Sequence, residues 1–131
     1  MLARQRPARR HVPRRAARDS SVTIVRPALV YGGAMKGRLA TLRALATGAA
    51  PQLFVLPQFS VHGFSMGRKV ADWVAASATI PGPETDRLGR LARDLDAWIA
   101  GTLFERHAAF PGRHFLTGFL ISPAGDVVLC Y

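Results

Sequence analysis

The sequence predicts a small α/β fold in which a mainly parallel sheet is flanked by helices. Stretches rich in β-branched and aromatic residues alternate with stretches whose apolar residues recur at helical spacing, a pattern typical of α/β proteins. The chain has 131 residues, of which 49% are hydrophobic, and this length and composition suit one folded domain. We expect residues 21–131 to form that domain and residues 1–20 to form a disordered basic tail.

The elements of this domain are predicted from local patterns along the chain. Short runs of β-branched and aromatic residues between Gly and Pro indicate strands, and leucines three or four residues apart indicate helices. We expect strands near residues 28–31, 53–56, 115–117 and 126–131, the first extending backwards towards residue 22 past a bend at Pro27. We expect helices near residues 39–46, 68–78 and 85–104.

The segment 85–104 carries the clearest helical pattern. Leu91, Leu95 and Trp98 fall on one face of a helix with 3.6 residues per turn, while Asp96 falls on the opposite face. The sequence therefore predicts that the three apolar side chains lie against the sheet and that Asp96 faces solvent.

The charge of the chain is concentrated in its first 18 residues. The formal net charge is +10, from 18 basic and 8 acidic residues. Seven of the basic residues are arginines in residues 1–18, and the segment from Asp19 onward has 11 basic and 8 acidic residues, a net charge of +3. The body of the protein is therefore ordinary in charge, and the basic character belongs to the tail.

Three interpretations of this tail remain open. It is a solvated start of the chain, an Arg-rich organelle-targeting peptide, or an arm that binds nucleic-acid phosphates through salt-sensitive contacts. Without a targeting role the protein is expected in the cytoplasm, and no segment is long and apolar enough to predict a transmembrane helix. The arginines that would contact nucleic acid are Arg4, Arg6, Arg9, Arg10, Arg14 and Arg15.

Several kinds of site are not expected. The single cysteine, Cys130, excludes an internal disulfide and a cysteine metal cluster. His62, His107 and His114 lack the close spacing of metal ligands, so we expect neither a metal nor a cofactor. A small sheet would leave an edge strand exposed, which suggests self-association as a homo-oligomer through that edge.

Four segments follow one another in a recognisable order along the chain: Leu29-Val30-Tyr31-Gly32-Gly33, Gly37-Arg38-Leu39, Phe54-Val55-Leu56-Pro57 and His62-Gly63-Phe64-Ser65. A turn and an apolar strand come after the helical segment 91–98. Together these features make residues 22–122 resemble the first half of an α/β-hydrolase of the monoacylglycerol-lipase or serine-aminopeptidase kind. The resemblance implies an incomplete α/β-hydrolase-like fold that hydrolyses a small acyl or ester substrate, with weak activity or none.

The resemblance allows two positions for the family's Gly-x-Ser-x-Gly nucleophile elbow. At residues 118–122 the nucleophile position is Leu120, and a leucine cannot attack a carbonyl. The segment Gly63-Phe64-Ser65-Met66-Gly67 is a literal match, with Ser65 as nucleophile. In that alignment Asp94 or Asp96 stands in the family's order as the acid. His107 or His114 follows as the histidine, with His114 as the candidate catalytic residue. The backbone N–H groups of Gly33 and Met66 would stabilise the oxyanion.

A rival resemblance covers residues 22–48 only. The segment Thr23-Ile24-Val25-Arg26-Pro27-Ala28-Leu29-Val30-Tyr31-Gly32 is similar to one in extended short-chain dehydrogenases, the sugar-nucleotide epimerases. It implies a fragment of an NAD-dependent enzyme, but the glycine loop that binds the pyrophosphate is missing. A third alternative is a basic nucleic-acid-binding protein without catalysis.

Overall fold

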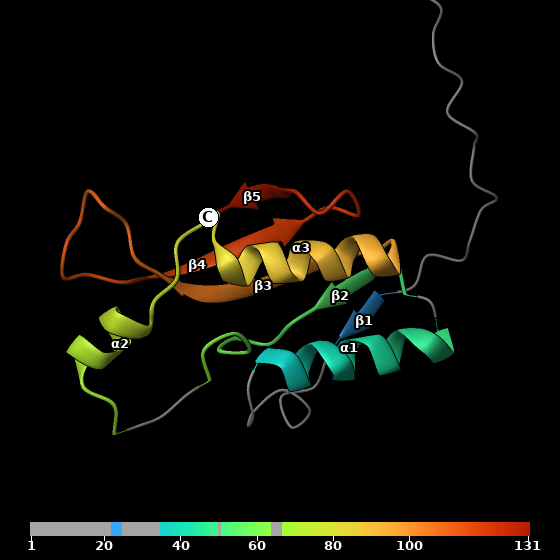
Figure 1. The fold of residues 1–131 in the computed structure, drawn as a ribbon, viewed down its shortest axis with the longest axis horizontal. Helices are drawn as coiled ribbons and strands as arrows, with labels where there is room; N and C mark the ends of the chain where they lie inside the picture. The colour runs from blue at the N-terminus through green and yellow to red at the C-terminus, as the bar shows by residue number, and fades with distance from the viewer. Residues whose placement is uncertain (1–21, 25–34, 50, 64–66) are drawn as a thin grey trace, which may run out of the picture.

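The structure is a computed structural model, and it describes residues 22–24, 35–49, 51–63 and 67–131 (Figure 1). Within these residues the chain forms a sheet with helices packed against it. No helix among the described residues is long and apolar enough to cross a membrane. The expected strand at 28–31 and the basic tail lie outside the described residues.

The described part of the sheet has five strands in the order β1-β2-β3-β4-β5. β1 pairs with β2 and β2 with β3 in parallel, whereas β3–β4 and β4–β5 are antiparallel pairs. The strands are β1 (Val22–Ile24), β2 (Leu53–Val55), β3 (Trp98–Glu105), β4 (Phe115–Ile121) and β5 (Val127–Cys130). The sheet is therefore mixed, and the expectation of a mainly parallel sheet was wrong.

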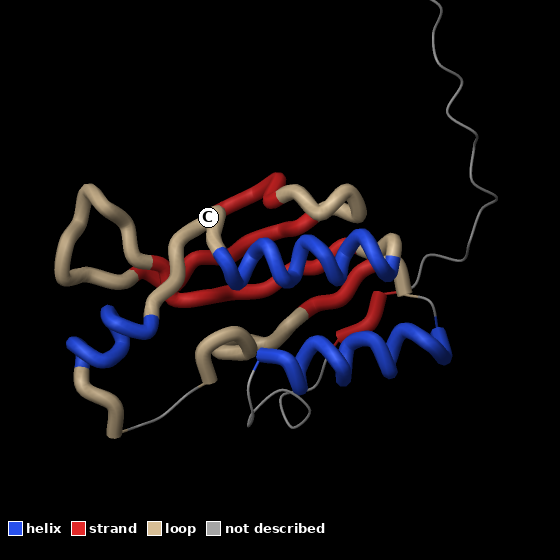
Figure 2. The backbone as a smooth tube through the Cα atoms, in the orientation of Figure 1, coloured by secondary structure: helices blue, strands red, loops and turns tan. Residues whose placement is uncertain are grey.

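The lengths of the connections between strands explain why the sheet has both parallel and antiparallel pairs. Parallel neighbours need a crossover of a dozen or more residues, whereas antiparallel neighbours are joined by a short loop or turn. The segments between β1 and β2 and between β2 and β3 contain helices, but residues 106–114 form only a loop between β3 and β4, drawn in tan in Figure 2. A turn at residues 122–126, with Gly125 at φ 87°, joins β4 to β5.

Three helices are present in the described residues, and the sequence indicated all of them. α2 and α3 begin close to their predicted starts, whereas α3 ends much earlier than predicted. The helices are α1 (Met35–Ala49), α2 (Val70–Ala76) and α3 (Pro83–Leu95). Pro83 starts α3, where its missing N–H has no cost.

The predicted helix at 85–104 is half helix and half strand. α3 ends at Leu95, and Asp96 takes the left-handed conformation at φ 49°. Trp98–Glu105 then forms β3, the longest of the described strands, whose backbone pairs with β2 on one side and β4 on the other. The apolar spacing of the helix continues into the strand by coincidence, and pairing on both sides stabilises the extended form. Trp98 is 38% exposed and does not belong to a helix face.

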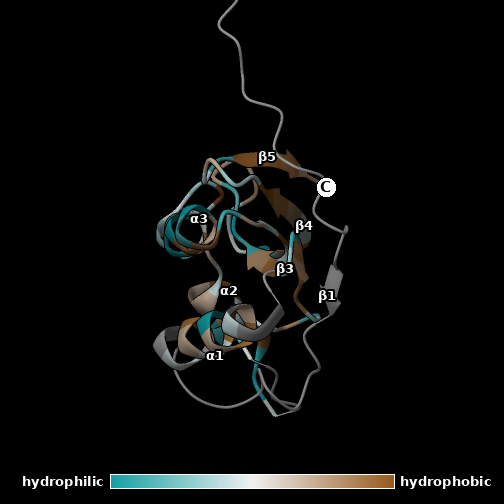
Figure 3. Cartoon of the chain, turned by 90° about the vertical axis from the view of Figure 1, so that its right-hand side faces the viewer, coloured by the Kyte–Doolittle hydropathy of each residue, from teal (hydrophilic) through white to brown (hydrophobic). Residues whose placement is uncertain are grey.

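Helices α1 and α3 cover one face of the sheet, which we call the helix-covered face. In Figure 3 α1 and α3 lie on the same side of the strands. Leu88 and Leu91 of α3 pack with Ile99, Leu103 and the other buried side chains of the sheet, whereas Leu95 is only partly buried at the border of this core. The buried hydrophobic core of the described residues is Leu42, Phe54, Leu56, Val61, Ala78, Leu88, Leu91, Ala92, Ala97, Ile99, Leu103, Phe119 and Ile121.

The opposite face of the sheet carries exposed apolar side chains. Because paired residues on neighbouring strands point to the same side, the register places Trp98, Leu116 and Leu129 on this face. Each of them is more than a third exposed. α1 and α3 lie on the other side of the strands (Figure 3), and at the carboxyl end Trp73 of α2 contacts Phe104, the partner of Leu116. The expected self-association through the sheet edge stays a prediction.

Candidate functional site

The ends of β2, β3 and β5 meet at one edge of the sheet. β2 and β3 are parallel, and β5 runs in the same direction as β3 because each is antiparallel to β4. The three carboxyl ends therefore lie at the same edge, on the side where α2 lies in Figure 1. We call it the carboxyl edge. Ligands of open α/β sheets bind at this edge, so the candidate site is built from the segments that end there.

The loop after β2 is tightly folded. The backbone N–H of Ser60 donates to the carbonyl of Pro57 at 3.2 Å, and the N–H of Gly63 donates to the carbonyl of Phe59 at 2.7 Å. Phe59 has a φ of 65°, which is uncommon for a bulky residue and carries backbone strain. Strain of this kind is concentrated at functional sites.

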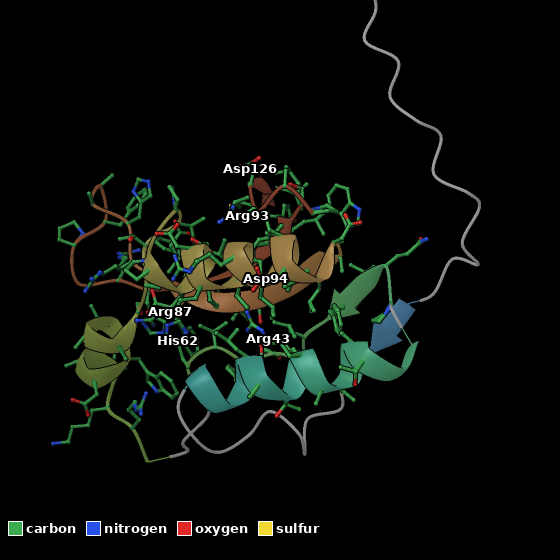
Figure 4. All side chains as sticks on the ribbon, turned by 45° about the vertical axis from the view of Figure 1, so that its right-hand side comes forward. Arg43, His62, Arg87, Arg93, Asp94 and Asp126 are labelled. Carbon is green, nitrogen blue, oxygen red and sulfur yellow. The ribbon has the colours of Figure 1, made fainter. Side chains whose placement is uncertain are left out.

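An aromatic cluster fixes this loop to the end of β3. The Phe104 ring lies 5.6 Å from the ring of Phe59, 4.8 Å from Trp73 and 5.1 Å from His114. The backbone N–H of Phe104 donates to His62 Nδ1 at 3.3 Å, and His62 lies near α2 in Figure 4. Because His62 Nδ1 accepts a hydrogen bond, the neutral ring carries its proton on Nε2. The cluster therefore positions a histidine at the carboxyl edge.

A pocket of about 390 Å³ opens beside this cluster, between the ends of β3, β4 and β5. Its best-fixed polar group is Glu105, whose Oε2 accepts a hydrogen bond of 2.7 Å from Thr117 Oγ1. Phe110 and Phe115 meet edge to face across the wall, with ring centroids 5.5 Å apart. The lining residues are Glu105, His107, Phe110, Phe115, Leu116, Thr117, Cys130 and Tyr131.

The thiol in this pocket is not an activated nucleophile. Partial burial raises the pKa of Cys130 above its usual value, and the nearby negative charge of Glu105 raises this pKa further. The thiolate is the reactive form of cysteine. Cys130 is therefore a neutral thiol at neutral pH, and it can donate only a weak S–H hydrogen bond.

We expect Cys130 to react slowly with iodoacetamide at pH 8, because the raised pKa reduces its thiolate fraction. Glu105→Gln removes the negative charge that contributes to the raised pKa, so this variant should react several-fold faster. Asp94→Asn is the matched control, since Asp94 forms an ion pair with Arg43 on the helical side of the molecule (Figure 4). Mass-spectrometric alkylation rates measure the effect, and equal rates for all three proteins would contradict it.

Most of the residues proposed from the sequence fall outside the described part of the chain. Ser65, Met66 and Gly33 lie there, as do the arginines of the tail, so their roles stay predictions. His114 is described: it is half-buried and stacks edge-on against Phe104. Among the described residues, no group of three His, Cys, Asp or Glu side chains could hold a metal ion.

Sequence reasoning missed the pair Glu105 and Thr117. The helix predicted for residues 85–104 ends immediately before Glu105, so that residue was not recognised as the end of a strand. Thr117 lies opposite Leu103 on the neighbouring strand, two pairs away from the pairing of Glu105 with Phe115 and on the same face of the sheet. The available signal was the position of a carboxylate immediately after an apolar run, which marks a strand end once the strand is known.

Comparison with known families defines the class of this protein. The family model described as carbon-nitrogen hydrolase matches residues 29–131. The chain belongs to the carbon-nitrogen hydrolase family.

The individual relatives are distant and much longer. The formamidase of Bacillus cereus (strain Q1) is 28% identical over 82 residues, which are 61% of this chain and 23% of that protein. The formamidase of Bacillus anthracis (strain A0248) is 27% identical over 82 residues, again 61% and 23%. The chain thus spans less than a quarter of the curated relatives it matches.

Solved structures show the same fold. A carbon-nitrogen hydrolase from Helicobacter pylori G27 has a TM-score of 0.64 at 17% identity, over 86% of this chain and 38% of that one. A double mutant of the amidase from Nesterenkonia sp. AN1, in complex with acrylamide, also has a TM-score of 0.64, at 20% identity over 92% and 44%. The chain therefore corresponds to under half of either structure.

These findings correct the functional expectations. The resemblance to the α/β-hydrolases was wrong, and so were ester hydrolysis, the short-chain dehydrogenase and nucleic-acid binding as readings of the chain's function. A nucleophile elbow needs a sharp strand-to-helix turn, but residues 118–121 lie inside the antiparallel strand β4. The matching segments were short runs of strand, glycine turn and helix, which many α/β families share.

Proposed function

We propose that this chain is part of an enzyme that hydrolyses the C–N bond of small carboxamides. The match of residues 29–131 to the carbon-nitrogen hydrolase family carries the proposal. The names of its relatives support an amide substrate, since they are formamidases and an amidase bound to acrylamide. In this reaction water adds its oxygen to the acyl carbon, the C–N bond breaks, and the products are a carboxylate and ammonium.

The carboxyl edge is where this chain would meet the substrate. It brings together the strained loop at 57–63, the histidine His62, and the pocket that contains Glu105. Amide hydrolysis needs groups that hold the nitrogen and move protons to it, and carboxylates and histidines do this in enzymes. The described residues supply such groups, and because the thiol of Cys130 is not activated, they supply no nucleophile from this pocket.

Ammonium release tests the proposal. We expect the product of the complete reading frame that contains this sequence to release ammonium from formamide or acrylamide faster than it hydrolyses p-nitrophenyl acetate. Arg43→Met, which removes an exposed ion pair on the helical side, should leave the rate unchanged. Absence of ammonium release from every small amide, or a preference for the ester, would overturn the assignment.

A further inference from the structure

The pocket at the ends of β3, β4 and β5 combines one fixed carboxylate with apolar walls. The carboxylate belongs to Glu105, and the apolar walls are formed mainly by the rings of Phe110 and Phe115. Its volume of about 390 Å³ lies within the range of ~300–1,000 Å³ that is usual for small-molecule sites. A few placed polar groups in a mostly apolar hollow are the usual composition of such a site.

Glu105 keeps acceptor capacity for a ligand. Thr117 Oγ1 donates to Oε2, and an ionised carboxylate has about four lone-pair positions on its two oxygens. No salt bridge joins Glu105 to a lysine or arginine within the parts of the chain that the structure describes. The hydrogen bond from Thr117 fixes the orientation of the Glu105 carboxylate, so its remaining lone pairs point in fixed directions and can accept from a ligand.

The other titratable groups of the pocket complement this acceptor. Cys130 is a neutral thiol and can donate an S–H hydrogen bond. His107 Nδ1 accepts a hydrogen bond of 3.2 Å from the N–H of Ala109, so its neutral ring carries the proton on Nε2 and can donate there. Tyr131 is almost fully exposed at the mouth. The pocket thus offers a strong acceptor together with weaker donors.

We propose that this pocket binds a primary carboxamide that carries an apolar substituent, with Glu105 accepting the amide N–H₂. The inference rests on the proposed function and assigns it a substrate class. A primary amide matches both the acceptor and the donors of the pocket. Its nitrogen donates to Glu105, and its carbonyl oxygen accepts from Cys130 or His107. An alkylammonium ion has donors only, so it would bind Glu105 and leave the donors of Cys130 and His107 without an acceptor. The substituent lies against Phe110 and Phe115, and formamide has no such group to bury.

Titration of the isotope-labelled chain with valeramide, followed by NMR, tests this assignment. We expect shifts at the backbone amides of Glu105, Thr117 and Cys130, and binding at least several-fold tighter than for formamide. Glu105→Gln should weaken valeramide binding about tenfold, the effect of losing ~1.4 kcal/mol from a hydrogen bond to a charged group. Asp126→Asn, a carboxylate of the neighbouring pocket, should leave binding unchanged.

A second variant tests the same pocket in case Glu105→Gln does not fold. Phe110 is 51% exposed in a loop, so Phe110→Ala should fold normally and weaken valeramide more than formamide. Tighter binding of pentylamine than of valeramide would overturn the amide assignment, and so would shifts confined to other residues. If the complete enzyme releases ammonium but Glu105→Gln binds valeramide as tightly as the unchanged chain, only the amide-binding role of this pocket is refuted. Valeramide binding without ammonium release from any amide would refute only the proposed function.

Discussion

Replacing Phe54 by alanine should lower the free energy of unfolding by ~3–5 kcal/mol, as is usual for a buried phenylalanine. Phe54 is fully buried, at 0% exposure, and lies in β2 between β1 and β3. Its side chain faces the core beside Ile99, its partner in β3. A domain of this size has a total stability of ~5–15 kcal/mol, so urea unfolding should show a large fall in midpoint.

The matched control is the same truncation at a half-exposed position. Phe110 is 51% exposed, so Phe110→Ala should cost about 1 kcal/mol or less. Both variants remove the same ring, and only the environment differs. If the two unfolded at the same urea concentration, Phe54 could not lie in the core, and the packing of the helices on the sheet would be wrong.

Replacing Gly89 by alanine should destabilise the protein, although alanine is the better helix former. Gly89 lies inside α3, where the intrinsic propensity alone would favour alanine by about 1 kcal/mol. A Cβ atom at this position would clash with the carbonyl oxygen of Gly125, in the turn between β4 and β5. Because the obstacle is backbone, helix and turn must move apart, at a cost of ~1–3 kcal/mol.

Gly37 provides the opposite result in a matched experiment. It also lies in a helix, α1, but a Cβ atom there would have no neighbour within 4 Å. Gly37→Ala should therefore raise the melting temperature slightly, while Gly89→Ala lowers it. A stabilising Gly89→Ala would show that α3 does not contact the turn at Gly125.

The candidate site was less predictable than the elements that form it. Glu105 and Thr117 are separated by 12 residues and by the loop at 106–114, and their hydrogen bond follows from the antiparallel pairing of β3 with β4. Once residues 98–104 are assigned to a helix, this pairing cannot be anticipated. The family assignment failed for a related reason, because the motifs used for it are local and carry no strand order.

The sequence by itself determined the α/β class, the approximate positions of most elements and the segregation of charge into the first 18 residues. Periodicity, glycine and proline are local properties, so they need no knowledge of distant contacts. The end of α3 at Leu95 and the mixed sheet were decided by tertiary structure. The segment Trp98–Glu105 has apolar residues that suit either a helix or a strand, and backbone pairing with β2 and β4 selects the strand. That same pairing brings the carboxyl ends of β3 and β5 together and so forms the pocket around Glu105.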